Sequence, residues 1–307
     1  MKLAPILLFV YNRPEHTFKT LTALKENDWS TKSTLYVYCD GPKNNVDSAT
    51  ISLINQVRRI VKQKKWCGFV KIVERDTNMG LANNILDGVT TVVNKHGAVI
   101  VLEDDIVTSN QFLRYMNTAL NYYENRSEVF HINGHNFKSK HQYILDDYYF
   151  LHYMNCWGWA TWQDRWDKLN RNYSWFYNKL LQDKKMLFKF NYGNTLQFHE
   201  QLQLNINKKI NTWAILWYST IFFNKGLCLT SKLSYVENIG LDGTGENCIA
   251  EAVFKEELAS KIIPFKGGIK VKEKKISRLS FMLTMASRKQ RGQLKLFFRI
   301  FKRYLKK

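Results

Sequence analysis

The sequence lacks paired cysteines and long apolar runs, and each shortage excludes a class of protein. Nothing approaches the roughly 18 consecutive apolar residues of a membrane-spanning helix. An apolar run follows Met1, but Pro5 interrupts it and no small-residue cleavage site follows, so we expect a buried strand in a protein that is not exported. No C-x-x-C pair occurs, which argues against a disulfide framework and a thiolate zinc site and fits a reducing, cytosolic setting; the five cysteines are Cys39, Cys67, Cys156, Cys228 and Cys248.

Two nucleotide-binding signatures and one zinc signature are also missing. Neither G-x-G-x-x-G nor G-x-x-x-x-G-K-[ST] occurs in the relevant loops, which argues against a dinucleotide-binding Rossmann site and a P-loop. His199 and Glu200 do not extend to a zinc-binding H-E-x-x-H pattern, because position 203 is Gln203. A nucleotide could therefore bind only in another way, for example through a metal ion.

Acidic residues are scarce at the C-terminal end of the chain. The whole chain carries 46 Lys and Arg against 26 Asp and Glu, a net charge of +20. Residues 266–307 hold 15 of the basic residues and one acid, Glu273, while the remainder carries 31 basic and 25 acidic residues. Such a local basic segment is typical of proteins that bind anionic membranes or nucleic acid.

The last part of this segment, residues 288–307, has apolar side chains at helical spacing, with Lys and Arg on the other face: Leu294, Phe297, Phe298, Phe301 and Leu305. This pattern predicts an amphipathic helix on an anionic membrane surface. A solvated tail is the plainer alternative. We expect no nucleic acid as a partner, because no recognised nucleic-acid-binding fold is present.

The first 105 residues alternate between apolar runs and amphipathic stretches, within a 307-residue chain long enough for one large or two modest domains. Strands are predicted over 6–11, 34–39, 70–74 and 98–102, with helices over 15–25, 48–64 and 81–94. This alternation predicts an α/β fold with a mostly parallel sheet that is covered on both faces. Further along, we expect helical structure over 110–124 and 194–223.

Polar residues follow each of the four predicted strands, and ligands of such sheets bind at the carboxyl ends of the strands. We therefore expect one cleft to collect Arg13, Asp40, Arg75, Asn78, Glu103, Asp104 and Asp105. Asp40-Gly41 alone could be an ordinary turn, and Asn78 could simply precede a helix, whose N-terminus favours phosphate.

The run Glu103-Asp104-Asp105 is the strongest chemical signal. Adjacent carboxylates repel one another, and a divalent cation such as Mg2+ or Mn2+ relieves that repulsion while also binding the phosphates of a substrate. The plainer alternative is a solvated acidic loop before the next helix. Its position at a strand end favours the metal site.

Four tryptophans lie within ten residues, from Trp157 to Trp166. Aromatic residues usually pack in a core, but indole rings also stack on sugars. We expect part of this cluster, including Trp157 and Trp159, to face a carbohydrate.

Taken in order, several motifs resemble bacterial GT-A-fold glycosyltransferases of the family-two-like type found in surface-polysaccharide gene clusters. The resemblance covers roughly residues 4–248 and rests on Tyr11-Asn12-Arg13-Pro14, Asp40-Gly41, Asn78-Met79-Gly80-Leu81, Leu102-Glu103-Asp104-Asp105, Trp157-Gly158-Trp159 and Asn238-Ile239-Gly240. The acidic triplet and the Gly-Trp segment also resemble the Golgi N-acetylglucosaminyltransferase I family.

This resemblance implies a GT-A fold, a Rossmann-like mixed sheet flanked by helices, over residues 1–265. Residues 1–107 would form the nucleotide-sugar-binding half, 108–265 the acceptor half, and 266–307 a basic amphipathic helical tail. Arg13, Asp40 and Arg75 would contact the base, ribose and diphosphate of the donor, for which a UDP-sugar is favoured. Asp105 would bind manganese, Glu103 and Asp104 would touch the donor sugar and ribose, and residues 157–162 would line the donor–acceptor junction.

The sequence departs from these families in two places. Residues 245–248 lack the histidine expected after the glycine-rich loop, and Thr212-Trp213-Ala214 lacks the carboxylate expected of a catalytic base. Glu200 and Asp164 are therefore the candidates for that base.

Together these features predict a metal-dependent hexosyl- or N-acetylhexosaminyltransferase. It would act on a glycan or lipid-linked acceptor in polysaccharide synthesis, as a cytoplasmic protein peripheral to the inner face of the cell membrane. The alternatives are a nucleotidyltransferase that makes a nucleotide sugar and a non-enzymatic, membrane-bound scaffold.

Overall fold

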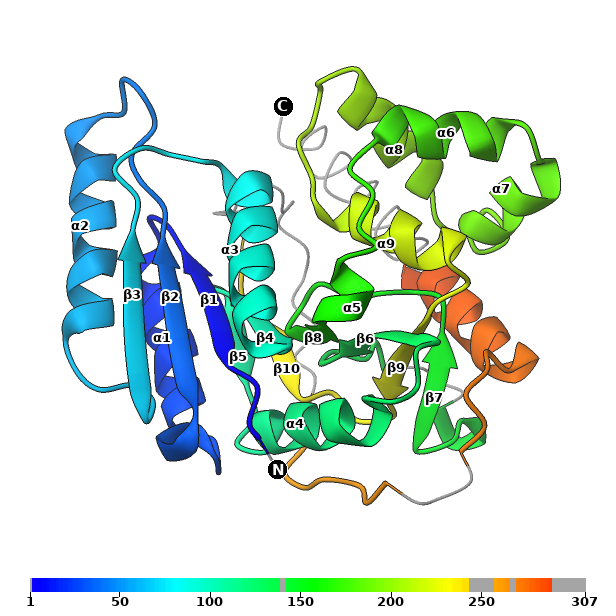
Figure 1. Cartoon of the computed structure of the whole chain (residues 1–307), viewed down its shortest axis with the longest axis horizontal. Helices are drawn as coiled ribbons and strands as arrows, with labels where there is room; N and C mark the ends of the chain where they lie inside the picture. The colour runs from blue at the N-terminus through cyan, green and yellow to red at the C-terminus, as the bar shows by residue number, and fades with distance from the viewer. Residues whose placement is uncertain (1, 139–141, 243–256, 266–268, 289–307) are drawn as a thin grey trace, which may run out of the picture.

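An eight-stranded mixed sheet runs through the chain (Figure 1). The computed structural model describes residues 2–138, 142–242, 257–265 and 269–288. The strand order is β3-β2-β1-β4-β8-β6-β9-β7. The first four strands along the chain pair in parallel, as predicted: β1 (Ile6–Val10), β2 (Thr34–Cys39), β3 (Phe69–Glu74) and β4 (Ala98–Glu103).

The second half of the sheet is mixed and contains β6 (Val129–Asn133), β7 (Tyr148–Leu151), β8 (Trp159–Trp162) and β9 (Leu227–Ser231). Strand β8 lies between β4 and β6 and is antiparallel to both. A separate antiparallel pair joins β5 (Ile106–Thr108) to β10 (Val236–Asn238). The predicted α/β class, with a Rossmann-like mixed sheet flanked by helices, is therefore confirmed.

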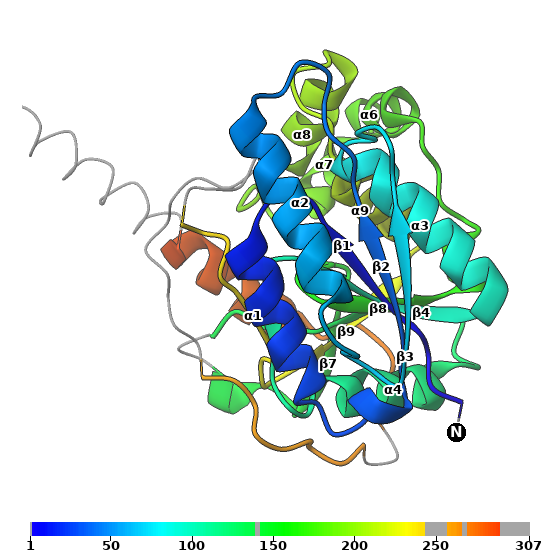
Figure 2. The same ribbon diagram turned by 90° about the vertical axis from the view of Figure 1, so that its left-hand side faces the viewer.

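Helices cover both faces of the sheet (Figure 2). One face packs against α1 (Pro14–Lys25), α2 (Ser48–Lys62) and α4 (Phe112–Tyr123). The other packs against α3 (Leu81–His96), α5 (Gln163–Trp166), α6 (Tyr173–Leu181), α7 (Lys184–Phe190), α8 (Phe198–Ile206) and α9 (Ala214–Phe223). Two 3-10 turns cover Ser30–Lys32 and Gln142–Ile144.

Local sequence explains where the helices of the first half begin and end. Pro14 occupies the first turn of α1, where its missing N–H and fixed φ cost nothing. The side chain of Asp47 caps α2 by accepting a hydrogen bond of 2.7 Å from the Thr50 amide. Helix α3 ends at Gly97, which adopts a left-handed φ of 86° that favours glycine.

The sequence predicted helical structure over 194–223. The structure divides this stretch into two helices, α8 and α9. Lys208 adopts a positive φ of 55°, which ends the helical path. Asn205 then holds the connecting turn, because its Oδ1 accepts from the Thr212 amide at 2.9 Å and its Nδ2 donates to the Thr212 hydroxyl at 3.0 Å.

A helix spans residues 275–288 near the C-terminal end of the described chain. It packs on the mixed half of the sheet through Phe281, whose ring centroid lies 4.4 Å from that of Tyr153. The predicted amphipathic helix over 288–307 lies outside the described residues, apart from Arg288. Among the residues that the structure describes, no helix is long and apolar enough to cross a membrane.

Candidate active site

The acidic triplet forms the turn between β4 and β5, at the carboxyl edge of the parallel strands. Glu103 is the last residue of β4, and Asp104 and Asp105 make the turn itself. Asp105 is buried, with a relative exposure of 8%. The predicted position of the triplet at a strand end is therefore confirmed.

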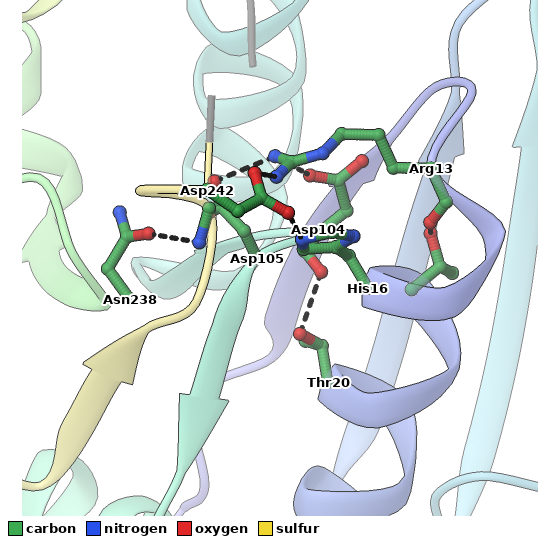
Figure 3. Close-up of polar contacts among 9 residues, drawn as sticks. Arg13, His16, Thr20, Asp104, Asp105, Asn238 and Asp242 are labelled. Carbon is green, nitrogen blue, oxygen red and sulfur yellow. Dashed lines mark hydrogen bonds and ion pairs between the residues drawn. The ribbon is translucent and has the colours of Figure 1, made fainter. Parts of the chain in front are cut away.

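Arg13 follows the neighbouring strand β1 and points into this turn (Figure 3). Its Nη1 donates to Asp105 Oδ2 at 2.9 Å and lies 3.6 Å from Asp104 Oδ1. Its Nη2 lies 3.6 Å from Asp242 Oδ1. The guanidinium thus serves as a shared positive charge for carboxylates from two separate parts of the chain.

The glycine-rich loop after β10 closes over the acidic turn. The Ile239 amide donates to the Asp105 carbonyl at 2.9 Å, and the Gly240 amide donates to Asn238 Oδ1 at 2.7 Å. Only glycine fits at position 240, because a Cβ there would lie 2.0 Å from Asp105 Oδ2. The motif Asn238-Ile239-Gly240 therefore lies against the triplet with which it was grouped in the sequence.

The structure adds two residues that the sequence analysis did not select. His16 Nε2 lies 3.1 Å from Asp242 Oδ2, and Thr20 Oγ1 donates to the Asp104 carbonyl at 2.8 Å. Arg13, His16 and Thr20 are spaced i, i+3 and i+7, so they share one face at the start of α1. This spacing is the signal by which His16 could have been found.

The acidic turn carries more negative charge than the groups around it neutralise. Burial, and then the charges of Asp105 and Asp104, raise the pKa of Glu103 well above its usual value, and Arg13 opposes the rise. Burial and the Asp105 charge raise the pKa of Asp104 to about 7. An additional cation would stabilise both carboxylates in their ionised form.

Asp40 has a different environment, although it also follows a strand of the parallel group. Its Oδ1 accepts from the amides of Gly41 and Met79, both at 2.9 Å, and its Oδ2 accepts from the Gly80 amide at 3.1 Å. These contacts join the end of β2 to the loop over residues 77–80. Asp40 thus has an observed structural role, and its contact with a donor nucleotide remains a prediction.

Arg75 and Asn78 belong to the same loop region and are also held by the protein. Arg75 pairs with Asp87 of α3 and lies over the ring of Tyr38, 5.3 Å from its centroid. Asn78 Nδ2 donates to the Gly41 carbonyl at 2.9 Å. A nucleotide at Arg75 would have to share its guanidinium with Asp87.

The tryptophan cluster divides into one half-buried ring and a buried group. Trp157 is half-buried and packs edge-on against His135, with ring centroids 4.6 Å apart. Trp159 is fully buried and stacks on His131 and on Trp213, with ring centroids 5.2 Å apart in both pairs. The expectation that Trp159 faces a ligand is therefore corrected, because its side chain is completely buried within the protein. Trp157 remains available to that role.

Neither candidate base contacts the acidic turn. Asp164 follows β8, and the pairing of Trp162 with Ala98 places it beside the start of β4. Glu103 lies five residues further along β4, about 16 Å from Ala98. Asp164 is therefore at the opposite edge of the sheet from the acidic turn, and its prediction as the catalytic base is wrong. Glu200 is exposed on α8 and accepts from Gln197 Nε2 at 3.0 Å; its role remains a prediction.

Within the described ranges, no three His, Cys, Asp or Glu side chains converge closely enough to hold a metal ion by themselves. A metal here would need ligands from a substrate, as Mg2+ commonly does when one or two carboxylates and substrate phosphates bind it. The carboxylates of Asp104, Asp105 and Asp242 already gather around one positive group, Arg13. Their oxygen donors fit a hard divalent cation.

No protein-family model matches the chain, and no curated protein does. Among solved structures, the mannosyltransferase PcManGT from Pyrobaculum calidifontis, in complex with GDP-Man and Mn2+, is 14% identical, with 52% of this chain and 44% of that chain covered and a TM-score of 0.38. TarS 1–349 from S. aureus is 10% identical, with 76% and 60% covered and a TM-score of 0.42. The galactosyltransferase LgtC, in complex with donor and acceptor sugar analogs, is 9% identical, with 71% and 70% covered and a TM-score of 0.36.

The chain thus spans less than two thirds of the mannosyltransferase and of TarS 1–349. Likenesses of this size do not assign an activity or a substrate to the chain.

Proposed function

We propose that this chain is a metal-dependent glycosyltransferase that moves a hexosyl or N-acetylhexosaminyl group from a nucleotide-diphosphate sugar to a glycan or lipid-linked acceptor. The observation that carries the proposal is the acidic turn after β4. It combines raised carboxyl pKa values, a neighbouring arginine and a position at the carboxyl edge of a parallel sheet, where ligands of such sheets bind. The motif order that resembles GT-A-fold glycosyltransferases agrees with this assignment.

Asp105 would hold the divalent cation, Mn2+ or Mg2+, together with Asp104 and the donor diphosphate. Asp242, in the glycine-rich loop, brings a further carboxylate to Arg13. It would be an additional ligand in a loop that lacks the expected histidine. When bound, the ion supplies positive charge beside the diphosphate that leaves as the sugar is transferred.

Arg13 provides a second positive charge at the same edge of the sheet. It is held by carboxylates on both of its terminal nitrogens, so its position is fixed before a substrate arrives. A preorganised cation beside a leaving diphosphate stabilises the charge that develops in the transition state. Arg75, Asn78 and Asp40 would support the base and ribose from the adjacent loop.

The acceptor would approach from the side of Trp157, the half-buried ring of the tryptophan cluster. A carboxylate could deprotonate the acceptor hydroxyl, and Glu200 remains the candidate for that role. We further propose that the basic segment 288–307 holds the protein on the inner face of the cell membrane, where a lipid-linked acceptor for surface polysaccharide would lie.

Calorimetric titration of the full chain with UDP, GDP, ADP and CDP, each with and without Mn2+, tests the proposal. We expect one nucleoside diphosphate, with UDP favoured, to bind in the presence of Mn2+ and to lose most of its affinity in Asp105→Asn. The matched control is Asp167→Asn, an exposed carboxylate near the opposite edge of the sheet. If no nucleotide binds with Mn2+ present, the scaffold alternative holds.

A product assay separates the two enzymatic alternatives. A glycosyltransferase incubated with its nucleotide sugar releases a nucleoside diphosphate, whereas a nucleotidyltransferase releases pyrophosphate from a nucleoside triphosphate and a sugar phosphate. Release of pyrophosphate without any nucleoside diphosphate would overturn the proposal.

A further inference from the structure

The helix over residues 275–288 has a buried face and a separate row of exposed apolar side chains. One face packs on the protein body, with Ser277, Ser280 and Phe281 each at most 9% exposed. Arg278 lies over the ring of Tyr192, 5.4 Å from its centroid. The packed face therefore accounts for the attachment of the helix but not for its exposed apolar residues.

The second face carries a stripe of three large apolar residues: Ile276, Leu279 and Leu283. They are 43%, 51% and 47% exposed, respectively. The spacing i, i+3 and i+7 places them in one row along the helix. Single exposed apolar residues are common on protein surfaces, but a row of them usually marks a binding surface.

The charge around the stripe indicates which partner it fits. Lys270 and Lys272 shortly before the helix, and Lys275 at its first position, are exposed. The chain then continues through residues 289–307, which contain eight Lys and Arg and no Asp or Glu. A second copy of this chain would bring the same positive charge against itself, whereas an anionic lipid surface offers both negative charge and an apolar layer.

We propose that the stripe Ile276–Leu279–Leu283 inserts into the interfacial region of an anionic bilayer. The inference deepens the membrane part of the proposed function and rests on it. It assigns the contact to a surface of the folded body that precedes the basic segment 288–307. A helix with an exposed apolar row, flanked in sequence by basic residues, fits an anionic membrane interface.

This placement would connect the membrane surface to the acceptor side of the candidate active site. The guanidinium of Arg288 lies over the ring of Phe137, 4.6 Å from its centroid. Phe137 in turn packs edge-on against His135 and Trp157, at 4.5 and 5.6 Å. A helix seated on lipid would thus hold the Trp157 region close to the membrane, where a lipid-linked acceptor would be presented.

The test is co-sedimentation of the full chain with vesicles of phosphatidylglycerol and, separately, of phosphatidylcholine. The variant is Leu279→Gln with Leu283→Gln, which removes apolar surface without changing charge. The matched control is Ile51→Gln with Leu53→Gln on α2, where two apolar residues are 43% and 36% exposed. Figure 1 places α2 at the opposite end of the long axis from the helix over 275–288, which is drawn in orange.

We expect wild type and control to bind phosphatidylglycerol vesicles equally well. The affinity of the stripe variant should be lower by at least about tenfold. Binding to phosphatidylcholine should be weak for all three. Equal binding by the stripe variant, or no binding by wild type, would overturn the proposal. So would a dimer of wild type in solution that the stripe substitutions dissociate, because the occupant would then be a second copy.

Thermal unfolding of each variant establishes that it is folded. Nucleotide binding in solution, measured on the same samples, should be unchanged in the stripe variant. A chain that binds lipid but no nucleotide would contradict the transferase and leave the membrane surface intact, so the two failures are distinguishable.

Discussion

Asp40 and Asp105 are both buried aspartates at the carboxyl edge of the parallel strands, yet their surroundings differ. Asp40 accepts three hydrogen bonds from backbone amides of its own loop and the next. Asp105 lies beside two other carboxylates and accepts from one arginine. A buried carboxylate whose hydrogen bonds are complete stabilises the fold, whereas a cluster with surplus negative charge is prepared for a cation.

The largest expected effect concerns the acidic turn. Asp105→Asn should lower the rate of sugar transfer by about 10²–10³-fold, because it removes a charge that the transition state requires. The fold should persist, since one source of repulsion among the three carboxylates is removed. Steady-state kinetics and thermal unfolding of the same protein check both statements; a rate within twofold of wild type would contradict the assignment of Asp105.

The second effect should be on stability and concerns Asp40. Asp40→Ala leaves three buried amides without their acceptor, so we expect the free energy of unfolding to fall by about 3 kcal/mol. Asp40→Asn keeps one oxygen and should cost less. Chemical denaturation of both variants measures the difference. If Asp40→Ala unfolds like wild type but binds nucleotide poorly, Asp40 is a ligand and the contrast with Asp105 is wrong.

His131 is a third buried titratable group, and it resembles Asp40 rather than Asp105 because both of its ring nitrogens have hydrogen-bond partners in the protein. Trp217 Nε1 donates to its Nδ1 at 3.2 Å, and its Nε2 donates to the Asn155 carbonyl at 3.1 Å. Burial lowers the pKa of His131 to about 3. Its contribution to stability is therefore complete above the unfolded pKa of about 6.5 and is lost as the pH falls toward 3.

The measurement is the difference in unfolding free energy between wild type and His131→Gln at several pH values. This difference should shrink by roughly 1 kcal/mol per pH unit between pH 6 and pH 4. In NMR spectra of wild type, the His131 ring signals should not titrate between pH 8 and pH 5. A midpoint near 6.5 would show that the ring is accessible to solvent.

The smallest effect should come from the loop that closes over the acidic turn. Gly240→Ala places a methyl group against Asp105 Oδ2 and should displace the loop, so we expect Mn2+-dependent nucleotide binding to weaken about tenfold. Gly97→Ala is the control, because nothing lies within 4 Å of a Cβ there and its cost is backbone strain alone. Nucleotide affinity that is unchanged in Gly240→Ala would separate the loop from the site.

The sequence predicted the first half of the fold well because its signals are local. Apolar runs such as 98–102 and the helical spacing over 48–64 predict strands and helices that pack against their neighbours in the chain, and the observed α2 ends two residues earlier. Because these strands are parallel, the polar residues at their carboxyl ends could be predicted to lie along one edge of the sheet. Arg13 and Asp105 were brought together as expected, whereas the contact of the Asn238-Ile239-Gly240 motif with this turn was not predicted.

The second half depends on contacts between distant segments, which local patterns do not encode. Strand β8 inserts beside β4 in the antiparallel direction, and this pairing buries Trp159 and moves Asp164 to the far edge of the sheet. The number of tryptophans gave no information about which rings face inward. The link between His16 and Asp242 likewise joins residues more than 200 positions apart.

The closure of the glycine-rich loop over Asp105 also has a consequence during synthesis on the ribosome. Strands β1 to β4 are complete once residue 103 has emerged, but the segment that covers the acidic turn follows more than 130 residues later. At about 5–20 residues per second, the charged turn waits roughly 7 to 27 seconds for its cover. During that interval Arg13, which is translated first, is the nascent chain's own counter-charge for it.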